Sequence, residues 1–361
     1  MADLLSVDAA LDAVLERVEP LSVTSLALET AAGHILAEAA TARIDLPPFA
    51  NSAMDGFAIR AADTPGRLPV VARSAAGRPA DRPVAPGEAI AVATGAVFPV
   101  GADAVVPIER VTEVDGSIDV ADAIALGANV RPRGGDVRAG DVVVEPGVRL
   151  GPAQIGALAA AGIDHVTCSE RPRMAVLTTG TELRRPGEAL APGQIYESNG
   201  PMLRALLGDA GALVEELGSV EDDEAAHRRA IARGLVFDVL VTSGGVSVGP
   251  HDLVRSIEAE LGVEEVFWGV SVKPGKPLAF GVEGRTLVFG LPGNPVSSLV
   301  SCVLFVLPAL RALQGERDPR PRYDVGRLSR PVKPDLRRDE LVRAWAGADG
   351  EGAVLEVLSG Q

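Results

Sequence analysis

Aromatic residues, basic charge and cysteine are all scarce in this chain of 361 residues. Aromatic residues make up 3% of it, which is too few to form a stacking platform for single-stranded nucleic acid. The formal net charge of −15 also argues against a DNA partner, because DNA binding needs a basic face. Any anionic substrate must therefore be held by local groups and not by the overall field of the protein.

The few cysteines and histidines exclude a disulfide framework and a zinc site. Cys168 and Cys302 lie far apart in separate apolar runs, which is typical of reduced core residues in a cytosolic protein. The four histidines show no zinc-ligand spacing. They are His34, His165, His227 and His251.

No signal peptide or membrane anchor is expected. The first residues are acidic and amphipathic, whereas a signal peptide begins with basic residues. The longest apolar run, Val296–Leu310, is shorter than the about 18 residues of a membrane span, and it carries serines and a proline. We expect a cytoplasmic protein with no membrane partner.

The first half of the chain predicts a small helical region interrupted by a β domain. Ser6 should cap a helix that reaches Val18, and helical structure should continue to about Ala42. From Asp45 to about Gly140, short apolar runs broken by proline and glycine predict β-strands. The helix Pro152–Ala161 resembles a resumption of the first region, so the β domain is interpreted as an insertion.

The second half alternates between apolar strands and helices. The predicted strands are Met174–Thr178, Leu213–Leu217, Val236–Thr242 and Thr286–Phe289, with a hairpin of Val266–Val272 and Leu278–Val282. The predicted helices are Pro201–Leu207, Asp223–Arg233, Asp252–Leu261 and Pro295–Leu313. This alternation predicts an α/β domain with a mostly parallel sheet covered on both faces, and ligands bind such sheets outside the carboxyl ends of the strands. A linker at Arg317–Arg322 and short β-like segments follow.

Loops at those strand ends predict an anion site. Glycine-rich turns precede helix starts at Ser243-Gly244-Gly245 and before Asn294-Pro295, which exposes backbone N–H groups and positive dipole ends. Lys273 and Lys276 share one proline-restricted loop. A tetrahedral or phosphate-bearing ligand is the leading hypothesis. Two plainer interpretations remain, namely a solvated lysine turn and an ordinary Asn-Pro helix start.

Acidic residues at loop ends predict a bound cation. They are Asp55, Asp136, Glu182, Asp222 and Asp252. Carboxylates together with phosphate oxygens form a hard-oxygen site that suits Mg²⁺. Taken singly, each acid is also explained by a turn or by a helix cap.

Seven ordered motifs carry a family resemblance over nearly the whole chain. They are PPFANSAMDGFAIR, ATGAVFPVGADAVV, TTGTEL, QIYESNG, VTSGGVSVGPHD, VKPGKPLAFG and GLPGNPVSS. With these motifs the chain resembles the molybdopterin molybdenumtransferases, the family of the bacterial MoeA proteins and the gephyrin E domain. The resemblance implies an elongated linker and dimerisation domain (1–44 and 141–172), an inserted β domain (45–140), a three-layer α/β domain like that of MogA (173–317) and a short, incomplete C-terminal β domain (318–361).

The resemblance also implies an activity, the last step of molybdenum cofactor synthesis. Adenylylated molybdopterin and molybdate enter, the phosphoanhydride is cleaved with Mg²⁺, AMP leaves, and molybdenum is inserted between the dithiolene sulfurs. A metal-held water or a molybdate oxygen attacks the phosphorus. The resemblance further implies a homodimer with a shared active site and a contact with the adenylyltransferase that supplies the intermediate.

Site residues are carried over from the motifs that match. Lys273, Lys276 and Ser297 are expected to hold the oxyanion, and Glu182, Asp222 and Asp252 to lie near pterin, phosphate and Mg²⁺. Asp55, Thr94 and Asp136 are expected to face the site from the β domain of the partner subunit. The remaining ligand-binding candidates are Gly180, Thr181, Asn199, Ser243, Gly244, Gly245, Pro277 and Asn294.

The chain departs from the family pattern at three places. Phe57 stands where the family usually has tyrosine, and Gly135 replaces a common glutamate. The arginine-rich segment 337–343 resembles the start of the family's C-terminal β domain, but the sequence ends at Gln361 before a serine segment that helps to hold molybdate. Two alternative functions therefore stay open, an adenylyltransferase and a non-catalytic dimeric scaffold.

Overall fold

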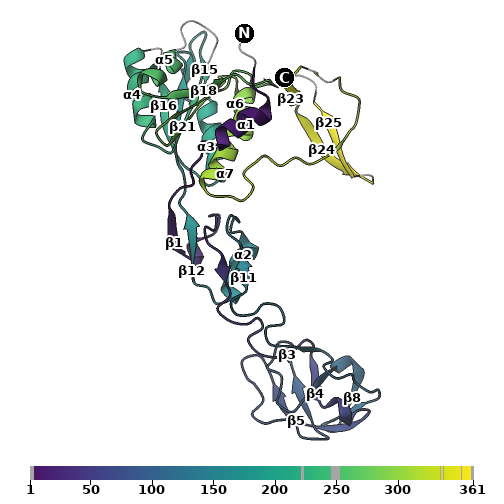
Figure 1. Cartoon of the computed structure of the whole chain (residues 1–361). Helices are drawn as coiled ribbons and strands as arrows, with labels where there is room; N and C mark the ends of the chain where they lie inside the picture. The colour runs from purple at the N-terminus through teal and green to yellow at the C-terminus, as the bar shows by residue number, and fades with distance from the viewer. Residues whose placement is uncertain are drawn as a thin grey trace.

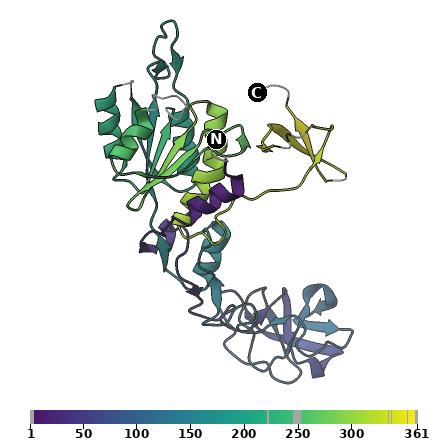
Figure 2. The ribbon, with the colours of Figure 1, turned by 45° about the horizontal axis from the view of Figure 1, so that its top comes forward.

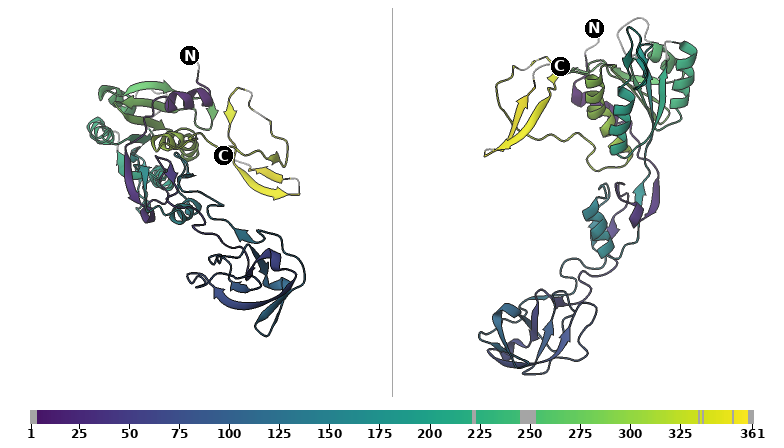
Figure 3. Two further views of the ribbon diagram at one scale, coloured as in Figure 1. Left: turned by 60° about the horizontal axis from the view of Figure 1, so that its bottom comes forward. Right: turned by 180° about the vertical axis from the view of Figure 1, so that it is seen from behind.

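The chain folds into separate parts arranged along one long axis. The computed structural model describes residues 4–220, 223–244, 253–333, 335, 337–350 and 352–358. An α/β domain lies at one end, a β domain lies at the other, and a narrow neck connects them (Figures 1 and 3). A small C-terminal sheet lies beside the α/β domain (Figure 1).

The N-terminal helix begins where the sequence predicts but ends earlier. Helix α1 spans Val7–Leu15, and the Ser6 side chain accepts a hydrogen bond of 3.1 Å from the backbone of Ala9. The expectation of helical structure up to Ala42 is wrong. Strand β1 (Val23–Ala27), a short 3₁₀ turn (Leu28–Thr30) and strand β2 (Ala40–Thr41) follow instead, because pairing with distant strands overrides local propensity.

The neck is built from both sides of the β domain in sequence. Strand β1 pairs antiparallel with β12 (His165–Ser169), and β2 pairs with β11 (Val142–Val144). Helix α2 (Pro152–Ala160) lies where the sequence predicts a helix, and its Leu158 shares an apolar cluster with Val144 of β11. The buried side chains form one small core that includes Leu36, Leu150, Leu158 and Cys168.

The chain enters and leaves the β domain at neighbouring points. Leu46 and Val137 form an antiparallel bridge there. The Asp45 carboxylate accepts hydrogen bonds from Arg133 Nε at 2.6 Å and from the Ala139 backbone at 2.9 Å. These bonds hold the two crossing segments together, which supports the interpretation of the β domain as an insertion.

The β domain contains a six-stranded sheet in the order β7-β4-β6-β5-β9-β8. These strands are β4 (Gly56–Ile59), β5 (Gly66–Ser74), β6 (Ala89–Val92), β7 (Ala104–Pro107), β8 (Val111–Val114) and β9 (Ser117–Val120). A separate pair, β3 (Asn51–Ser52) and β10 (Val130–Arg131), lies on the side of the neck (Figure 1). Two apolar clusters fill the domain, and Phe57 is buried in one of them.

The α/β domain confirms the predicted fold class. Its sheet order is β16-β13-β17-β21-β20-β18. The first four strands are parallel, namely β16 (Leu213–Val220), β13 (Arg173–Thr179), β17 (Val239–Ser243) and β21 (Thr286–Leu291). The hairpin strands β18 (Glu264–Trp268) and β20 (Ala279–Glu283) complete the sheet in antiparallel pairing.

Helices cover both faces of this sheet, as Figure 2 shows. One apolar core lies between the sheet and α1, α3 (Asn199–Asp209) and the helix Pro295–Leu313. A second core lies under α4 (Glu224–Gly234) and α5 (Leu253–Glu260). The domain therefore has three layers.

The helix Pro295–Leu313 is longer than the apolar run noted in the sequence. It consists of α6 (Pro295–Ser301), a π-turn (Cys302–Val306) and α7 (Leu307–Leu313). Its 19 residues and hydropathy of 2.0 would suffice to cross a membrane, but 67% of it is buried inside the protein. Its apolar composition is therefore explained by its place in the core of the domain.

The C-terminal segments pair with each other and with the α/β domain. Strands β22 (Arg327–Leu328), β24 (Ala344–Asp349) and β25 (Gly352–Val357) form a three-stranded sheet. Strand β23 (Asp339–Glu340) pairs in parallel with β19 (Val272–Lys273). This second pairing joins the C-terminal part to the lysine loop, and the sequence did not predict it.

Candidate functional site

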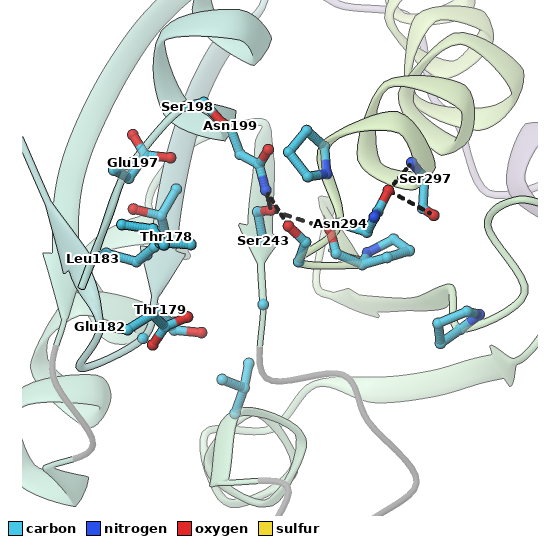
Figure 4. A pocket seen from close by; sticks show the side chains of 18 of the residues that line it. Thr178, Thr179, Glu182, Leu183, Glu197, Ser198, Asn199, Ser243, Asn294 and Ser297 are labelled. Carbon is cyan, nitrogen blue, oxygen red and sulfur yellow. Dashed lines mark hydrogen bonds between the residues drawn. The ribbon is translucent and has the colours of Figure 1, made fainter. Parts of the chain in front are cut away.

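A cavity of about 730 Å³ lies at the carboxyl ends of β13, β17 and β21. The strand ends form its floor. Its walls come from a ribbon of β14 (Leu183–Arg184) and β15 (Ile195–Tyr196), from the start of α3 and from the start of α6. Figure 4 shows Glu182 and Glu197 on one wall, with Asn294 and Ser297 on the opposite wall. The cavity thus lies at the sheet edge where the sequence predicts ligand binding.

Asn199 joins two of the loops that form the cavity. Its side-chain nitrogen donates to Ser243 Oγ and to the Gly293 carbonyl, both at 2.9 Å (Figure 4). Asn199 is 8% exposed, and its bond to Ser243 is buried while its bond to Gly293 is partly buried, so loss of the Ser243 bond would be costly. Asn199 therefore fixes the end of β17 relative to the loop after β21.

Gly244 allows a close approach of two strand ends. Its φ is +94°, and a Cβ atom there would lie 2.6 Å from the Thr179 carbonyl oxygen. Any other residue would push the β13 and β17 loops apart. The glycine is thus explained by the shape of the cavity floor.

The start of α6 forms the wall of the cavity at which the sequence predicts anion binding. The Asn294 side chain accepts a hydrogen bond of 3.2 Å from the Ser297 backbone, and Pro295 takes the first helical position, which confirms the predicted cap. The Ser297 hydroxyl lies 3.4 Å from the Asn294 side-chain oxygen. Lys276 and Pro277 line the cavity beside this helix start. A positive dipole end and an ammonium group therefore occur together.

The two lysines expected to hold the oxyanion lie in different surroundings. Lys273 is not among the lining residues, and its Nζ donates to Glu340 Oε1 at 2.7 Å. The reason is the β19–β23 pairing, which brings the C-terminal carboxylate to this lysine. Among the described lining residues, Lys276 is the only lysine or arginine.

The acidic candidates are divided between described and undescribed segments. Glu182 lines the cavity, whereas Asp222, Asp252 and Gly245 lie outside the described residues. Glu197, which the sequence did not single out, also lines the cavity and accepts a hydrogen bond from the Gly200 backbone at 2.8 Å. Within the described ranges, no three acidic, histidine or cysteine residues group to hold a metal ion. Those residues alone do not make a Mg²⁺ site.

The candidates of the β domain lie far from this cavity in the same chain (Figure 1). Asp55 Oδ1 accepts a hydrogen bond of 2.8 Å from the Thr94 backbone. Asp136 forms an ion pair with Arg131. All three candidates are exposed to solvent, and none lines the cavity.

The other candidates lie at the cavity with one exception. Gly180, Ser243 and Gly244 belong to its floor. Thr181 is exposed and does not line the cavity. Together with Asn199, Pro277, Asn294 and Ser297, the lining candidates come from five separate segments of the chain.

Besides Glu197, the sequence analysis also missed His227 and Trp268, which line the cavity. His227 is buried on α4, and its Nδ1 lies 3.0 Å from the Asp223 carbonyl oxygen. Trp268 ends β18, and the Arg255 guanidinium lies 5.6 Å from its ring centroid. The four-residue spacing of His227 from the helix cap Asp223 was the available signal, because it places the side chain on the first turn beside the strand ends.

The cysteines take no part in this site. Both are buried and unpaired by disulfide. Burial raises the pKa of the Cys168 thiol to about 11 and that of the Cys302 thiol to about 12. Neither thiol is ionised near neutral pH, so neither is a nucleophile.

Comparison with known proteins identifies the family. Residues 5–162 match the model of the MoeA N-terminal region (domain I and II), and residues 175–312 match that of a probable molybdopterin binding domain. A molybdopterin molybdenumtransferase of Haemophilus influenzae is 39% identical over 319 residues, which cover 87% of this chain and 79% of the relative. The chain belongs to the molybdopterin molybdenumtransferase family.

Other relatives agree with this assignment. Molybdopterin molybdenumtransferase 2 of Mycobacterium tuberculosis is 38% identical over 321 residues, covering 85% of this chain and 79% of the relative. The crystal structure of the molybdopterin biosynthesis protein MoeA from Pyrococcus horikoshii OT3 superposes with a TM-score of 0.83 at 29% identity, covering 99% of this chain and 91% of the other. The family resemblance and the fold are thereby confirmed. All described lining residues of the cavity fall within the region that matches the molybdopterin binding model.

Proposed function

We propose that this protein is a molybdenumtransferase that inserts molybdenum into molybdopterin during molybdenum cofactor biosynthesis. Its substrates are adenylylated molybdopterin and molybdate, and its reaction cleaves the phosphoanhydride and releases AMP. The named relatives support the transferase assignment. The observation that carries the proposal is the cavity itself, in which Lys276 lies beside the capped start of α6.

Electrostatic stabilisation and positioning are the catalytic contributions that this cavity can make. The N–H groups at the start of α6 and the Lys276 ammonium favour a bound oxyanion. The hydrogen bonds of Asn199 hold the end of β17 and the loop after β21 in a fixed relative position. No side-chain nucleophile is assigned; the attacking atom belongs to a water or to molybdate, and both alternatives stay open.

The reaction depends on Mg²⁺ in this proposal, and Glu182 is the candidate ligand within the described residues. The described acids alone do not complete a metal site, so no chemical step is derived through the metal. The readout for the metal is the dependence of AMP release on added Mg²⁺.

The site is completed by a second subunit in this proposal. Asp55, Thr94 and Asp136 are exposed in the β domain, and Asp136 lies beside the Leu46–Val137 bridge at its junction with the neck. None of the three lines the cavity of the same chain, so in this proposal they act on the cavity of another copy. A symmetric homodimer would bring each β domain to the α/β domain of its partner. We also propose a cytoplasmic location and a transient contact with the adenylyltransferase.

The division into domains proposed from the sequence fits the separate apolar cores. Residues 1–44 and 141–172 share the core of the neck, with α1 packed instead on the α/β domain. Residues 45–140 contain the two clusters of the β domain. Residues 173–317 hold the α/β cores, and 318–361 contain the C-terminal sheet.

An assay of AMP release tests the proposed function. Purified protein is incubated with adenylylated molybdopterin, molybdate and Mg²⁺, and AMP is measured by chromatography. Molybdate-dependent AMP release is the expected result. Consumption of ATP with free molybdopterin would indicate an adenylyltransferase instead, and an intact adenylylated substrate would indicate a scaffold.

A further inference from the structure

Glu340 and Lys273 form an ion pair at the edge of the candidate site. Lys273 Nζ lies 2.7 Å from Glu340 Oε1, with side-chain exposures of 38% and 23%. Sixty-seven residues separate the two in sequence. The pair therefore joins the C-terminal part of the chain to the loop that also carries Lys276.

Backbone pairing fixes the place of Glu340. The Asp339 N–H donates to the Ser271 carbonyl at 3.1 Å, and the Leu341 N–H donates to the Lys273 carbonyl at 2.8 Å. Leu341 also packs against the main apolar core of the α/β domain. The carboxylate is thus presented to Lys273 by an anchored strand, and little conformational freedom has to be lost when the ion pair forms.

The lysine loop lies against α6. A Cβ atom at Gly275 would be 2.9 Å from Ser301 Oγ and 3.7 Å from the Ser297 carbonyl oxygen. Lys273 and Lys276 flank this contact in sequence, and the chain contains only one other lysine, Lys333. An oxyanion at the start of α6 therefore lies within the field of both ammonium groups and of the Glu340 carboxylate.

We propose that Glu340 is a specificity-determining residue that sets the oxyanion affinity of this site by neutralising Lys273. The inference rests on the proposed function, because it concerns the same anion site. Lys273 and Glu340 together carry no net charge, so of the two loop lysines only Lys276 presents a net positive charge to an incoming anion. An anion that reaches Lys273 must share the ammonium group with the Glu340 carboxylate or displace that carboxylate.

The charge of the anion gives this role a distinct signature. Coulomb energy is proportional to the charge of the ligand, so loss of the Glu340 charge should help a dianion twice as much, in free energy, as a monoanion. Molybdate and perrhenate are both tetrahedral oxyanions, but molybdate carries two negative charges and perrhenate carries one. A merely structural role for Glu340 would affect both anions alike.

The test measures Kd for molybdate and perrhenate by isothermal titration calorimetry with the full chain. Glu340→Gln keeps a side-chain oxygen that can accept from Lys273 but removes the charge. We expect Kd to fall about tenfold for molybdate and about threefold for perrhenate at low salt. Both gains should shrink at high ionic strength, because salt screens exposed charges.

Two control variants separate charge from folding. Asp339→Asn removes a carboxylate from the same strand, and no ion pair within the described residues joins Asp339 to Lys273; its Kd should change less than about twofold. Glu340→Asp keeps the charge and should bind as the unmodified protein does. Melting temperatures of all variants show whether the β19–β23 pairing survives.

The outcomes distinguish this inference from the proposed function. If the unmodified protein binds molybdate and Glu340→Gln binds it no more tightly than Asp339→Asn does, the role of Glu340 is wrong while the proposed function stands. Equal gains for molybdate and perrhenate also overturn it. If neither the unmodified protein nor Glu340→Gln binds molybdate, both proposals fail.

Discussion

The α/β domain and the distal β domain use similar residues in different ways. Both place acids and small polar residues in loops after strands. In the α/β domain these loops surround one cavity, and hydrogen bonds from Asn199 hold them together. In the β domain the Asp55 carboxylate accepts a hydrogen bond from the Thr94 backbone, and both residues are exposed. The loops of the α/β domain therefore meet at one cavity, whereas the candidate residues of the β domain do not line it.

The largest expected effect concerns the cavity domain. Lys276→Ala removes the only lysine or arginine among the described lining residues, and we expect molybdate-dependent AMP release to fall about 100-fold in kcat/KM. The melting temperature should not change, because the side chain is exposed. Lys333→Ala is the matched control, since Lys333 is an exposed lysine away from the lining residues. An equal fall in kcat/KM in both variants would show that the cavity has no specific role in the reaction.

The next prediction tests whether the β domain contributes residues to the cavity of a second subunit. Asp55→Asn should lower AMP release at least about tenfold in the homodimer. A purified mixed dimer of Asp55→Asn and Lys276→Ala chains should regain about half of the normal activity, because one of its two shared sites is intact. An inactive mixed dimer would show that both residues act within one chain.

A smaller effect is expected from breaking the Asn199 link. Asn199→Ala leaves the buried Ser243 hydroxyl and the partly buried Gly293 carbonyl without their donor, which should lower the free energy of unfolding by about 1–3 kcal/mol. It should also raise KM, because the two cavity loops are no longer held together. Urea denaturation and AMP kinetics provide the two measurements.

The matched control for this variant lies in the other domain. The Asn129 side chain donates to the Val105 carbonyl at 3.0 Å in the β domain. Asn129→Ala should also destabilise the protein but leave KM unchanged. A rise in KM for both variants would mean that KM rises because the protein is less stable. It would not then be explained by movement of the two cavity loops relative to each other.

The smallest effect concerns the junction between neck and β domain. The hydrogen bond from the Ala139 backbone and the bond from Arg133 lower the pKa of the Asp45 carboxyl below its usual 3.8. A lowered pKa stabilises the fold above the unfolded-state pKa, and this contribution is lost as pH falls through the folded-state value. Asp45→Asn should therefore melt slightly earlier than the unmodified protein at pH 7. The difference in melting temperature should shrink as pH falls through the folded-state pKa of Asp45, and a difference that stays constant as the solution is acidified would contradict the assignment.

The spacing of apolar residues, together with the glycine, proline and capping residues between elements, was enough to predict most of the α/β domain. Continuous apolar strands and capped helix starts are local signals, as the Ser6 and Asn294 caps illustrate. The neck was misjudged because its strands pair with segments more than a hundred residues away. Local propensity carries no information about such pairing.

The candidate site could be predicted only in part for a similar reason. Loops at parallel strand ends must meet at one sheet edge, so Ser243 and Asn294 were correctly brought together. The side chain of Lys273 could not be placed, because its partner Glu340 comes from a strand that pairs across the domain boundary. His227 and Trp268 were missed because a single buried histidine or tryptophan more often belongs to a core than to a site.

The double crossing between neck and β domain has a mechanical consequence. Two antiparallel segments, bridged at Leu46 and Val137 and clamped by Asp45, form a strap that resists stretching far more than bending. The length of these two segments thus sets how far the β domain and its acids lie from the neck. The orientation of the β domain is set by the surface that it contacts. Insertion of residues into both segments should therefore move these acids away from the neck. In the proposed homodimer this should lower activity even when every contact within each domain is kept.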